Sequence, residues 1–242
     1  MRFDGKRYWL VGASEGLGRA LAIKLSAAGA ELVLSARAEG RLHSLADDLP
    51  GKAQVLQLDL ADEASVAQAG AALGRVDGVV FLAGVYWPMS AREWDGPSVL
   101  AMADINFIGV FRVLNQVMPQ FLERGAGHIV ITGSLSGFRG LPGAIGYGAS
   151  KAGVMALAES LYADLRRTGI KVQVANPGFI KTRLTEKNAF HMPFLMSPDE
   201  AADHMLHHMA SKRFKRSFPT LFSWLFRFSQ FWPDWLYYWV FR

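Results

Sequence analysis

Ser134, Tyr147 and Lys151 have the residue types and the spacing of a proton-transfer set. Positions i and i+4 of a helix share a face, so the ammonium of Lys151 can lie beside the phenol of Tyr147. A tyrosine with its ordinary pKa of about 10 is a poor base at neutral pH. One cation about 4 Å away contributes about 4 kcal/mol at an effective dielectric constant of about 20, enough to lower that pKa by about two to three pH units. The set predicts general acid–base catalysis, whereas the Tyr–Lys pair alone is more often a half-buried ring beside a solvated amine.

A glycine-rich segment near the start of the chain is the second candidate site. Gly12, Gly16 and Gly18 follow an apolar run at residues 7–12 and precede a helical pattern at residues 19–29. Glycines between a strand and a helix allow backbone N–H groups and the positive helix end to hold a pyrophosphate. The spacing differs from the Gly-x-Gly-x-x-Gly fingerprint, and alone it fits a simple tight connection. Together with the proton-transfer set it predicts a dinucleotide site.

These motifs together resemble the short-chain dehydrogenase/reductase family over about residues 6–211. The resemblance implies that Tyr147 is the general acid or base toward the substrate oxygen and that Ser134 hydrogen-bonds this oxygen. It also implies that Lys151 lowers the tyrosine pKa and binds the nicotinamide ribose, and that Asn106 holds a water that relays protons to Lys151. The residues that it assigns to the cofactor are Gly12, Ser14, Glu15, Gly16, Leu17, Gly18, Arg37, Asp59, Leu60, Ala83, Gly84, Tyr147, Lys151, Pro177, Gly178 and Thr182.

Some of these positions have simpler explanations, and two depart from the family pattern. Asp59 also fits a strand-end residue, and Thr182 also fits a helix cap. Val11 stands where the family usually has threonine, and Leu82 replaces the asparagine of the usual Asn-Ala-Gly. We expect these two departures to alter hydrogen bonding around the central strands and to leave the reaction class unchanged.

The pattern of elements predicts one α/β domain with a Rossmann-like, doubly wound parallel sheet. A chain of 242 residues can form a single unit with a sizeable core. Strand-like runs alternate with helical stretches, including apolar helices at residues 99–122 and 153–165. The runs lie at residues 31–35, 54–59, 78–82, 128–132 and 171–175. We expect a catalytic domain at residues 1–211 and a basic, aromatic-rich helical extension at residues 212–242 that is not an independent domain.

The absence of cysteine excludes disulfides and cysteine-ligated metal. The first strand begins too early for a cleavable signal, so we expect a cytoplasmic protein. His204 and His208 have i,i+4 spacing, but no acidic or cysteine pattern accompanies them, so we expect no metal site. The resemblance implies a homo-oligomer, a dimer or tetramer, paired through the helices at residues 99–122 and 153–165.

The end of the second predicted strand bears on the cofactor. This strand lacks an acidic residue that would bond a ribose 2'-hydroxyl, and Arg37 stands there instead. A guanidinium favours a 2'-phosphate, which predicts NADP(H) over NAD(H). Two observations weaken the prediction. Arg37 also fits a solvated helix-entry residue, and Glu15 occupies a loop position where some NADP-preferring relatives carry a base.

The segments expected beside the substrate are apolar, which favours a bulky hydrophobic carbonyl or alcohol. They contain Tyr86, Trp87, Phe138, Leu141 and Phe179, and an irregular segment at residues 183–196 that resembles the mobile substrate loop of relatives. Alternatively, these side chains only pack beneath loops.

The C-terminal extension carries all of the net charge. Residues 212–242 contain six basic residues and one acidic residue, so the chain's net charge of +5 belongs to them and residues 1–211 sum to zero. The high pI is therefore a property of the extension and gives no reason to expect nucleic-acid binding by the domain, so we expect no nucleic-acid partner. Within the extension, the polar residues from Thr220 to Asp234 recur every three or four positions as a narrow stripe on an otherwise apolar helix, which Pro233 can bend or break.

No uncharged run in the extension reaches the roughly 20 residues needed to cross a bilayer. A basic cluster followed by Trp- and Tyr-rich helix instead predicts contact with the inner membrane surface. The alternative is packing against the domain or a second subunit beside the substrate mouth. The sequence as a whole predicts an NADP(H)-dependent oxidoreductase that interconverts a ketone and a secondary alcohol on a hydrophobic, lipid-like substrate. The alternatives are a non-catalytic dinucleotide-binding sensor or scaffold, and an enzyme for a small soluble carbonyl whose extension is an oligomer interface.

Overall fold

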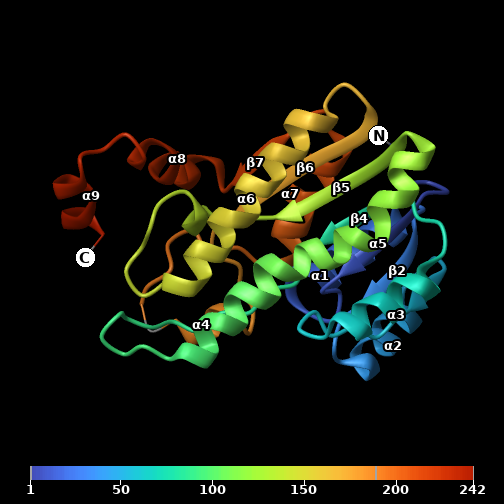
Figure 1. The fold of residues 1–242 in the computed structure, drawn as a ribbon, viewed down its shortest axis with the longest axis horizontal. Coiled ribbons are helices and arrows are strands. Elements are labelled where there is room, and N and C mark those ends of the chain that lie inside the picture. Colours follow the sequence, from blue (N-terminus) through green and yellow to red (C-terminus); the bar gives the residue numbers. More distant parts are fainter. Residues whose placement is uncertain (1, 189, 242) are drawn as a thin grey trace.

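The computed structural model describes residues 2–188 and 190–241, and its centre is a seven-stranded parallel sheet (Figure 1). The strand order is β3-β2-β1-β4-β5-β6-β7. The strands are β1 (Arg7–Val11), β2 (Glu31–Ser35), β3 (Ala53–Val55), β4 (Gly78–Phe81), β5 (Ala126–Thr132), β6 (Gly169–Pro177) and β7 (Lys215–Phe218). The helices are α1 (Gly16–Ala27), α2 (Glu39–Asp48), α3 (Glu63–Leu73), α4 (Gly96–Ala103), α5 (Gly109–Arg124), α6 (Ile145–Leu165), α7 (Pro198–Ala210), α8 (Thr220–Ser229) and α9 (Asp234–Val240).

The chain reverses its direction across the sheet at β1, which pairs with β2 on one side and β4 on the other. Val11 therefore lies between Ser35 and Phe81 at the carboxyl ends of three neighbouring strands. In doubly wound sheets such a switch point opens a crevice that binds ligands. The topology confirms the predicted Rossmann-like fold and fixes where a site can form.

Helices cover both faces of the sheet and bury most of its central strands, whereas the edge strands β3 and β7 are partly exposed. On one face α3, α5 and α6 form a core that includes Val66, Val113 and Val154. On the other face α1, α2 and α7 pack through residues such as Leu21 and Met205. Burial on both sides explains why the strands are continuous apolar runs rather than alternating ones.

Two predicted elements differ from the structure. The long helix expected at residues 99–122 is divided into α4 and α5 by a π-helical turn at Asp104–Ile108. The continuous stretch Gly96–Arg124 is the one helix among the described residues that is long and apolar enough to cross a bilayer by length and composition. Its α5 half packs Val113, Val117 and Phe121 into the sheet core, as a helix of a globular domain does.

The C-terminal extension is not one helix. It begins with β7, which pairs with β6 at the edge of the sheet, and continues into α8 and α9. The break between the two helices falls at Pro233, where the sequence allowed one. Figure 1 shows α8 and α9 projecting from the sheet beside the loop that joins β5 to α6.

Candidate active site

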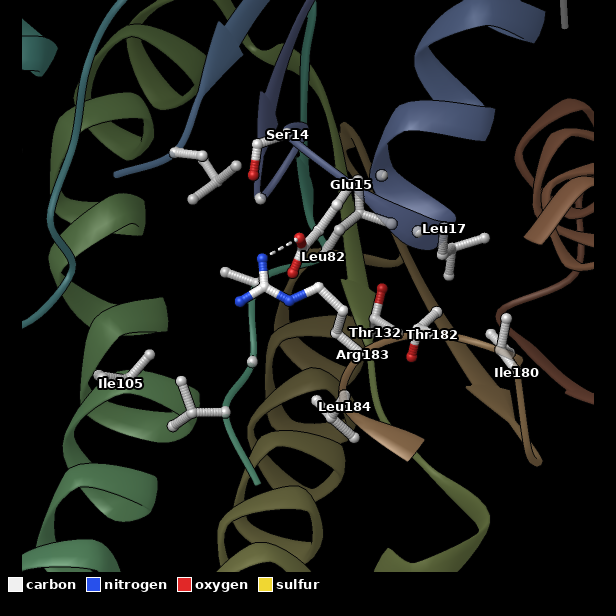
Figure 2. Close-up of a pocket in the computed structure, with 18 of the residues that line it drawn as sticks. Ser14, Glu15, Leu17, Leu82, Ile105, Thr132, Ile180, Thr182, Arg183 and Leu184 are labelled. Carbon is white, nitrogen blue, oxygen red and sulfur yellow. Dashed lines mark hydrogen bonds and ion pairs between the residues drawn. The ribbon is translucent and has the colours of Figure 1, made fainter. Parts of the chain in front are cut away.

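A cleft of about 290 Å³ lies at the carboxyl ends of the central strands (Figure 2). Its walls come from the segments that follow β1, β2, β3, β4, β5 and β6, together with α6. All of the residues predicted to bind the cofactor line this cleft, and so does Ser134. Asn106 is the one predicted site residue that does not line it.

The loop after β1 requires glycine for steric reasons. Gly12 has a φ of 96°, and a Cβ there would lie 2.5 Å from the backbone nitrogen of Ala83. A Cβ on Gly18 would lie 1.9 Å from the carbonyl oxygen of Gly12. Helix α1 starts at Gly16, so its first turn directs unpaired backbone N–H groups toward the cleft. This geometry supports an anion at the helix end.

Ser134 and Tyr147 both line the cleft and lie on different elements. Ser134 follows β5 and begins a short 3-10 turn, and its hydroxyl accepts a hydrogen bond from the Ser136 hydroxyl at 2.9 Å. Tyr147 and Lys151 lie on the first turns of α6. Burial raises the pKa of Tyr147 to about 12, and a hydrogen bond with the Ser134 side chain acts in the opposite direction. At neutral pH the phenol is therefore protonated.

Lys151 is buried and points to the end of β5. Its Nζ donates a hydrogen bond of 2.9 Å to the carbonyl oxygen of Thr132 and lies 5.7 Å from the centroid of the Tyr147 ring. Burial lowers the pKa of the Lys151 ammonium to about 8. Burial raises the Tyr147 pKa in this structure, and the Lys151 Nζ lies beside the ring rather than bonded to the phenol oxygen, so the predicted lowering of that pKa by Lys151 stays a prediction.

Asn106 lies behind the cleft in the π-helical turn, fully buried. Its amide nitrogen donates to the carbonyl oxygen of Val85 at 2.9 Å and to the Ser150 hydroxyl at 3.1 Å. Its amide oxygen accepts from the Val85 backbone nitrogen at 2.7 Å. The side chain thus joins the segment after β4 to the residue preceding Lys151, which is a positioning role. Its predicted part in a proton relay stays a prediction.

The two departures from the family pattern are accommodated by backbone hydrogen bonds. The carbonyl oxygen of Val11 accepts bonds from the backbone nitrogens of Leu82 and Ala83, at 2.8 and 3.0 Å. The Val11 side chain is fully buried, and the Leu82 side chain packs against the core on the other face of the sheet. Backbone bonds and apolar packing therefore hold β1 to the segment after β4.

Two arginines that the sequence did not point to also line the cleft. The Glu15 carboxylate pairs with Arg183 at 2.9 Å and with Arg41 at 2.6 Å, and Figure 2 shows the first of these contacts. Arg41 lies on α2, one turn after Arg37, so two guanidiniums lie near the end of β2. The partners of Glu15 are set by tertiary structure, which is why no local motif indicated them.

The histidines considered as metal ligands have other partners. His204 Nδ1 accepts a hydrogen bond from Arg216 at 3.1 Å, and His208 Nε2 donates to the Val174 carbonyl oxygen at 3.1 Å. Within residues 2–188 and 190–241, no group of three or more His, Cys, Asp or Glu side chains has the arrangement of a metal site.

Comparison with known proteins agrees with this geometry. The family model described as short chain dehydrogenase matches residues 6–192, which is most of the chain. The chain is a short-chain dehydrogenase/reductase. It is therefore an enzyme, an oxidoreductase that uses a nicotinamide dinucleotide. It is 34% identical over 194 residues to the 3-oxoacyl-[acyl-carrier-protein] reductase of Escherichia coli, covering 76% of this chain and 78% of the relative.

Two solved structures of the family share the fold. A short-chain dehydrogenase from Sphingobium yanoikuyae in complex with NADPH aligns with a TM-score of 0.83 and 28% identity, over 89% of this chain and 88% of that one. A short-chain dehydrogenase/reductase from Burkholderia phymatum in complex with NAD aligns with a TM-score of 0.86 and 25% identity, over 95% and 94% of the chains. The family's structures thus include both forms of the cofactor.

The cleft of this short-chain dehydrogenase/reductase fits such a cofactor on its own geometry. The Thr132 hydroxyl lines the cleft and is buried without a hydrogen-bond partner among the described residues. Gly84 leaves the space above Asn106 and Lys151 open, since even an added Cβ would stay 3.5 and 3.8 Å from their polar atoms. Unsatisfied buried polar groups call for a ligand or water. The glycine loop, Thr132 and Lys151 are the residues that would hold the dinucleotide.

Proposed function

We propose that this enzyme uses NADP(H) to interconvert a ketone and a secondary alcohol on a bulky apolar substrate. The observation that carries the reaction is the convergence of Ser134, Tyr147 and Lys151 on the same cleft as the glycine loop. A scaffold that only bound a dinucleotide would not need three polar side chains in this arrangement. The non-catalytic alternative is therefore disfavoured.

The reaction needs one proton and one hydride. The dinucleotide, when held in the cleft, would supply the hydride. The Tyr147 hydroxyl donates its proton to the carbonyl oxygen, and its raised pKa keeps that proton available at neutral pH. The Ser134 hydroxyl stabilises the negative charge that develops on this oxygen. Lys151, whose pKa is lowered to about 8, is suited to return a proton toward Tyr147. Alcohol oxidation is the same sequence in reverse.

Aromatic side chains pack beside Tyr147 and beside the residue that follows Ser134, which supports an apolar substrate. The Tyr86 ring meets the Tyr147 ring edge-on at 5.1 Å between centroids. Phe222 of α8 packs with Leu135 and contacts the ring of Phe179 at 6.1 Å. The C-terminal extension therefore packs directly against Leu135, the residue after the catalytic serine.

Two described residues of the segment expected to be the substrate loop, Lys187 and Phe194, contact these aromatic side chains. Lys187 donates a hydrogen bond of 2.8 Å to the Tyr86 carbonyl oxygen, and its Nζ lies 4.5 Å from the centroid of the Trp87 ring. The exposed ring of Phe194 contacts Phe222 at 5.3 Å between centroids. An apolar chain between these rings would be sequestered from water, whereas a small soluble carbonyl would leave most of them without contacts.

The preference for NADP(H) is supported by charge at the end of β2. Arg37 and Arg41 line the cleft there, and no carboxylate follows β2 directly. Two guanidiniums favour a 2'-phosphate over a 2'-hydroxyl through charge-assisted hydrogen bonds. Glu15 opposes this preference because it pairs with Arg41.

The decisive experiment measures NADPH oxidation against ketones graded by chain length, for the wild type and Tyr147→Phe. We expect kcat/KM to rise with chain length, and the variant to lose about 10²-fold or more, the usual contribution of a general acid. NADH in place of NADPH tests the cofactor. Turnover that survives Tyr147→Phe would remove the mechanism, and a preference for short, soluble ketones would favour the alternative in which the extension is an oligomer interface.

The predicted cytoplasmic location and the predicted dimer or tetramer stay predictions. Several apolar side chains on the helices implied in subunit pairing are exposed, including Leu100, Ile108, Phe111 and Tyr162. Sedimentation velocity of the purified enzyme tests the assembly.

A further inference from the structure

Helix α8 has two apolar faces, and only one of them is covered. Phe222 and Phe226 are buried against the loop that carries Ser134. Leu221, Trp224 and Phe228 lie on the opposite side and are 74%, 51% and 58% exposed. Their spacing of three and four residues places them on one outward face. The outward face of a helix in a soluble protein normally carries polar and charged residues. The apolar outward face of α8 therefore indicates that a partner covers it.

Helix α9 repeats the arrangement. Its one fully buried residue is Tyr237, whereas Trp235, Tyr238 and Trp239 are 73%, 55% and 62% exposed at i, i+3 and i+4 spacing. Phe231, in the turn between the helices, is 83% exposed. Most of the large outward side chains of the extension are therefore Trp, Tyr or Phe. Contiguous exposed apolar surface of this kind marks an interaction site.

The exposed faces belong to a segment that is fixed to the domain. Arg139, in the loop between β5 and α6, donates hydrogen bonds to the carbonyl oxygens of Ser229 and Trp232 at 2.6 and 2.9 Å. The Tyr237 hydroxyl donates to the Gly140 carbonyl oxygen at 2.9 Å. The outward rings are thus held in position by contacts on their inner side, and their exposure does not result from a frayed terminus.

The extension also contains exposed Lys and Arg side chains that have no ion-pair partner among the described residues. Lys212, Arg213 and Arg227 are exposed, and their side chains form no ion pair in the described part of the chain. The other cations of the extension that the structure describes have partners, since Lys215 pairs with Glu159 and Arg216 bonds His204. Arg227 lies on α8 between the outward rings of Trp224 and Phe228, and Lys212 and Arg213 precede β7 in the same extension, while residues 1–211 have no net charge.

We propose that the outward faces of α8 and α9 dock on the interface of an anionic lipid bilayer. Trp and Tyr are favoured at the level of the headgroups, and the cations are attracted to anionic lipid. Helices of 10 and 7 residues are too short to span, so they lie in the interface. A second copy of the chain on the same surface would bring like charges together, which disfavours it as the occupant.

This surface goes beyond the reaction proposed above, because docking requires no turnover. It also gives the apolar pocket a source of substrate. The inner side of α8 packs Phe222 against Leu135, next to Ser134, while its outer side presents Trp224 to the bilayer. A substrate dissolved in lipid then reaches the cleft without crossing bulk water.

Vesicle flotation of the full-length enzyme tests the proposal. The vesicles contain phosphatidylcholine alone or phosphatidylcholine with phosphatidylglycerol, at low and high salt. We expect strong binding to the anionic vesicles, weakened by salt. Trp224→Gln combined with Trp235→Gln and Trp239→Gln should reduce binding at least about tenfold, because these rings supply the buried apolar area. Trp94→Gln is the matched control, since Trp94 is 60% exposed outside the extension.

A second variant tests the charge without touching the rings. Lys212→Gln, Arg213→Gln and Arg227→Gln together should abolish the difference between anionic and neutral vesicles. Tyr147→Phe should float like the wild type, which separates docking from catalysis. The proposal is overturned if the wild type does not bind vesicles, or if Trp94→Gln weakens binding as much as the triple tryptophan variant does. It is also overturned if sedimentation velocity shows a dimer that the triple tryptophan variant dissociates, because the rings would then bind a second copy of the chain instead of lipid.

Discussion

The guanidinium of Arg139 lies over the ring of Tyr237, with Cζ 4.0 Å from the ring centroid. The two residues are far apart in sequence, and they join the loop between Ser134 and Tyr147 to the end of the chain. The same guanidinium also pairs with Asp234, at the start of α9. One side chain therefore joins both helices of the extension to the loop between Ser134 and Tyr147.

Arg139→Ala should weaken both stability and substrate binding. Arg139 is only 16% exposed and makes charge-assisted bonds to two carbonyl oxygens, so we expect a loss of about 2–3 kcal/mol in the free energy of unfolding. We also expect KM for long apolar ketones to rise more than kcat falls, because the packing of α8 against Leu135 is loosened. Urea unfolding and steady-state kinetics measure the two effects. Arg227→Ala is the control, and an equal loss in that variant would contradict this role for Arg139.

Glu15→Gln should increase the preference for NADPH. Removing the carboxylate frees Arg41 from its ion pair beside Arg37, and one negative charge near the 2'-phosphate disappears. Since the groups are exposed, we expect a modest effect of about two- to fivefold in the ratio of kcat/KM for NADPH over NADH. Asp48→Asn provides the control, because Asp48 pairs with Arg19 outside the cleft. An unchanged ratio, or a shift toward NADH, would show that Arg41 does not bind the 2'-phosphate of NADPH.

Gly12→Ala should be strongly destabilising. Its Cβ would meet backbone atoms of Ala83 within 2.7 Å, and the φ of 96° is unfavourable for alanine. We expect a loss of about 2–4 kcal/mol in the free energy of unfolding and weaker cofactor binding. Gly40→Ala is the matched substitution, since Gly40 lies in α2 with no atom within 4 Å of the new Cβ, and it should stabilise by up to about 1 kcal/mol. Equal effects at the two positions would refute the steric argument.

His128 should make the protein sensitive to acid. Its ring is buried between the Tyr8 hydroxyl and the Gln173 side-chain oxygen, both at 2.8 Å, and burial lowers its pKa to about 3. The unfolded chain takes up this proton near the ordinary pKa of about 6.5, so the neutral ring's contribution is complete above that pH. It is lost as the pH falls from about 6.5 toward 3, by up to about 1.4 kcal/mol per pH unit.

Urea unfolding at several pH values measures this slope. His208, whose pKa burial lowers to about 4, adds a similar slope above that pH. His128→Gln should therefore reduce the slope of the unfolding free energy against pH by about half. The variant should also have a lower unfolding free energy at neutral pH. His43→Gln, at an exposed position, should leave the slope unchanged. A wild-type stability that does not fall between pH 6.5 and pH 5 would contradict the assignment.

The sequence predicted the elements that have a local signal. β1, β2, β4, β5 and β6 are apolar runs because both faces of the sheet are covered, and such runs are visible without a structure. The residues assigned to the cofactor lie together because parallel strands end at one edge. β7 was missed because Lys215–Phe218 is basic and polar, as suits an edge strand.

The features that were missed depend on contacts between distant residues. The π-helical turn around Asn106 interrupts a pattern that reads as one continuous helix. Arg41, Arg183 and Arg139 carry no motif, and each acquires its role from a partner elsewhere in the chain. The burial that raises the pKa of Tyr147 also depends on tertiary contacts, because spacing gives the position of the lysine but not the desolvation of the phenol.

The attachment of the extension has a geometric consequence. Only Pro219 separates β7 from α8, so the outward rings are joined to the sheet without a linker. If these rings rest on a lipid surface, the cleft stands at a constant height above it. The distance between the bilayer and the cleft would then be fixed. The enzyme would select lipids by the position of the carbonyl along the acyl chain as well as by their shape.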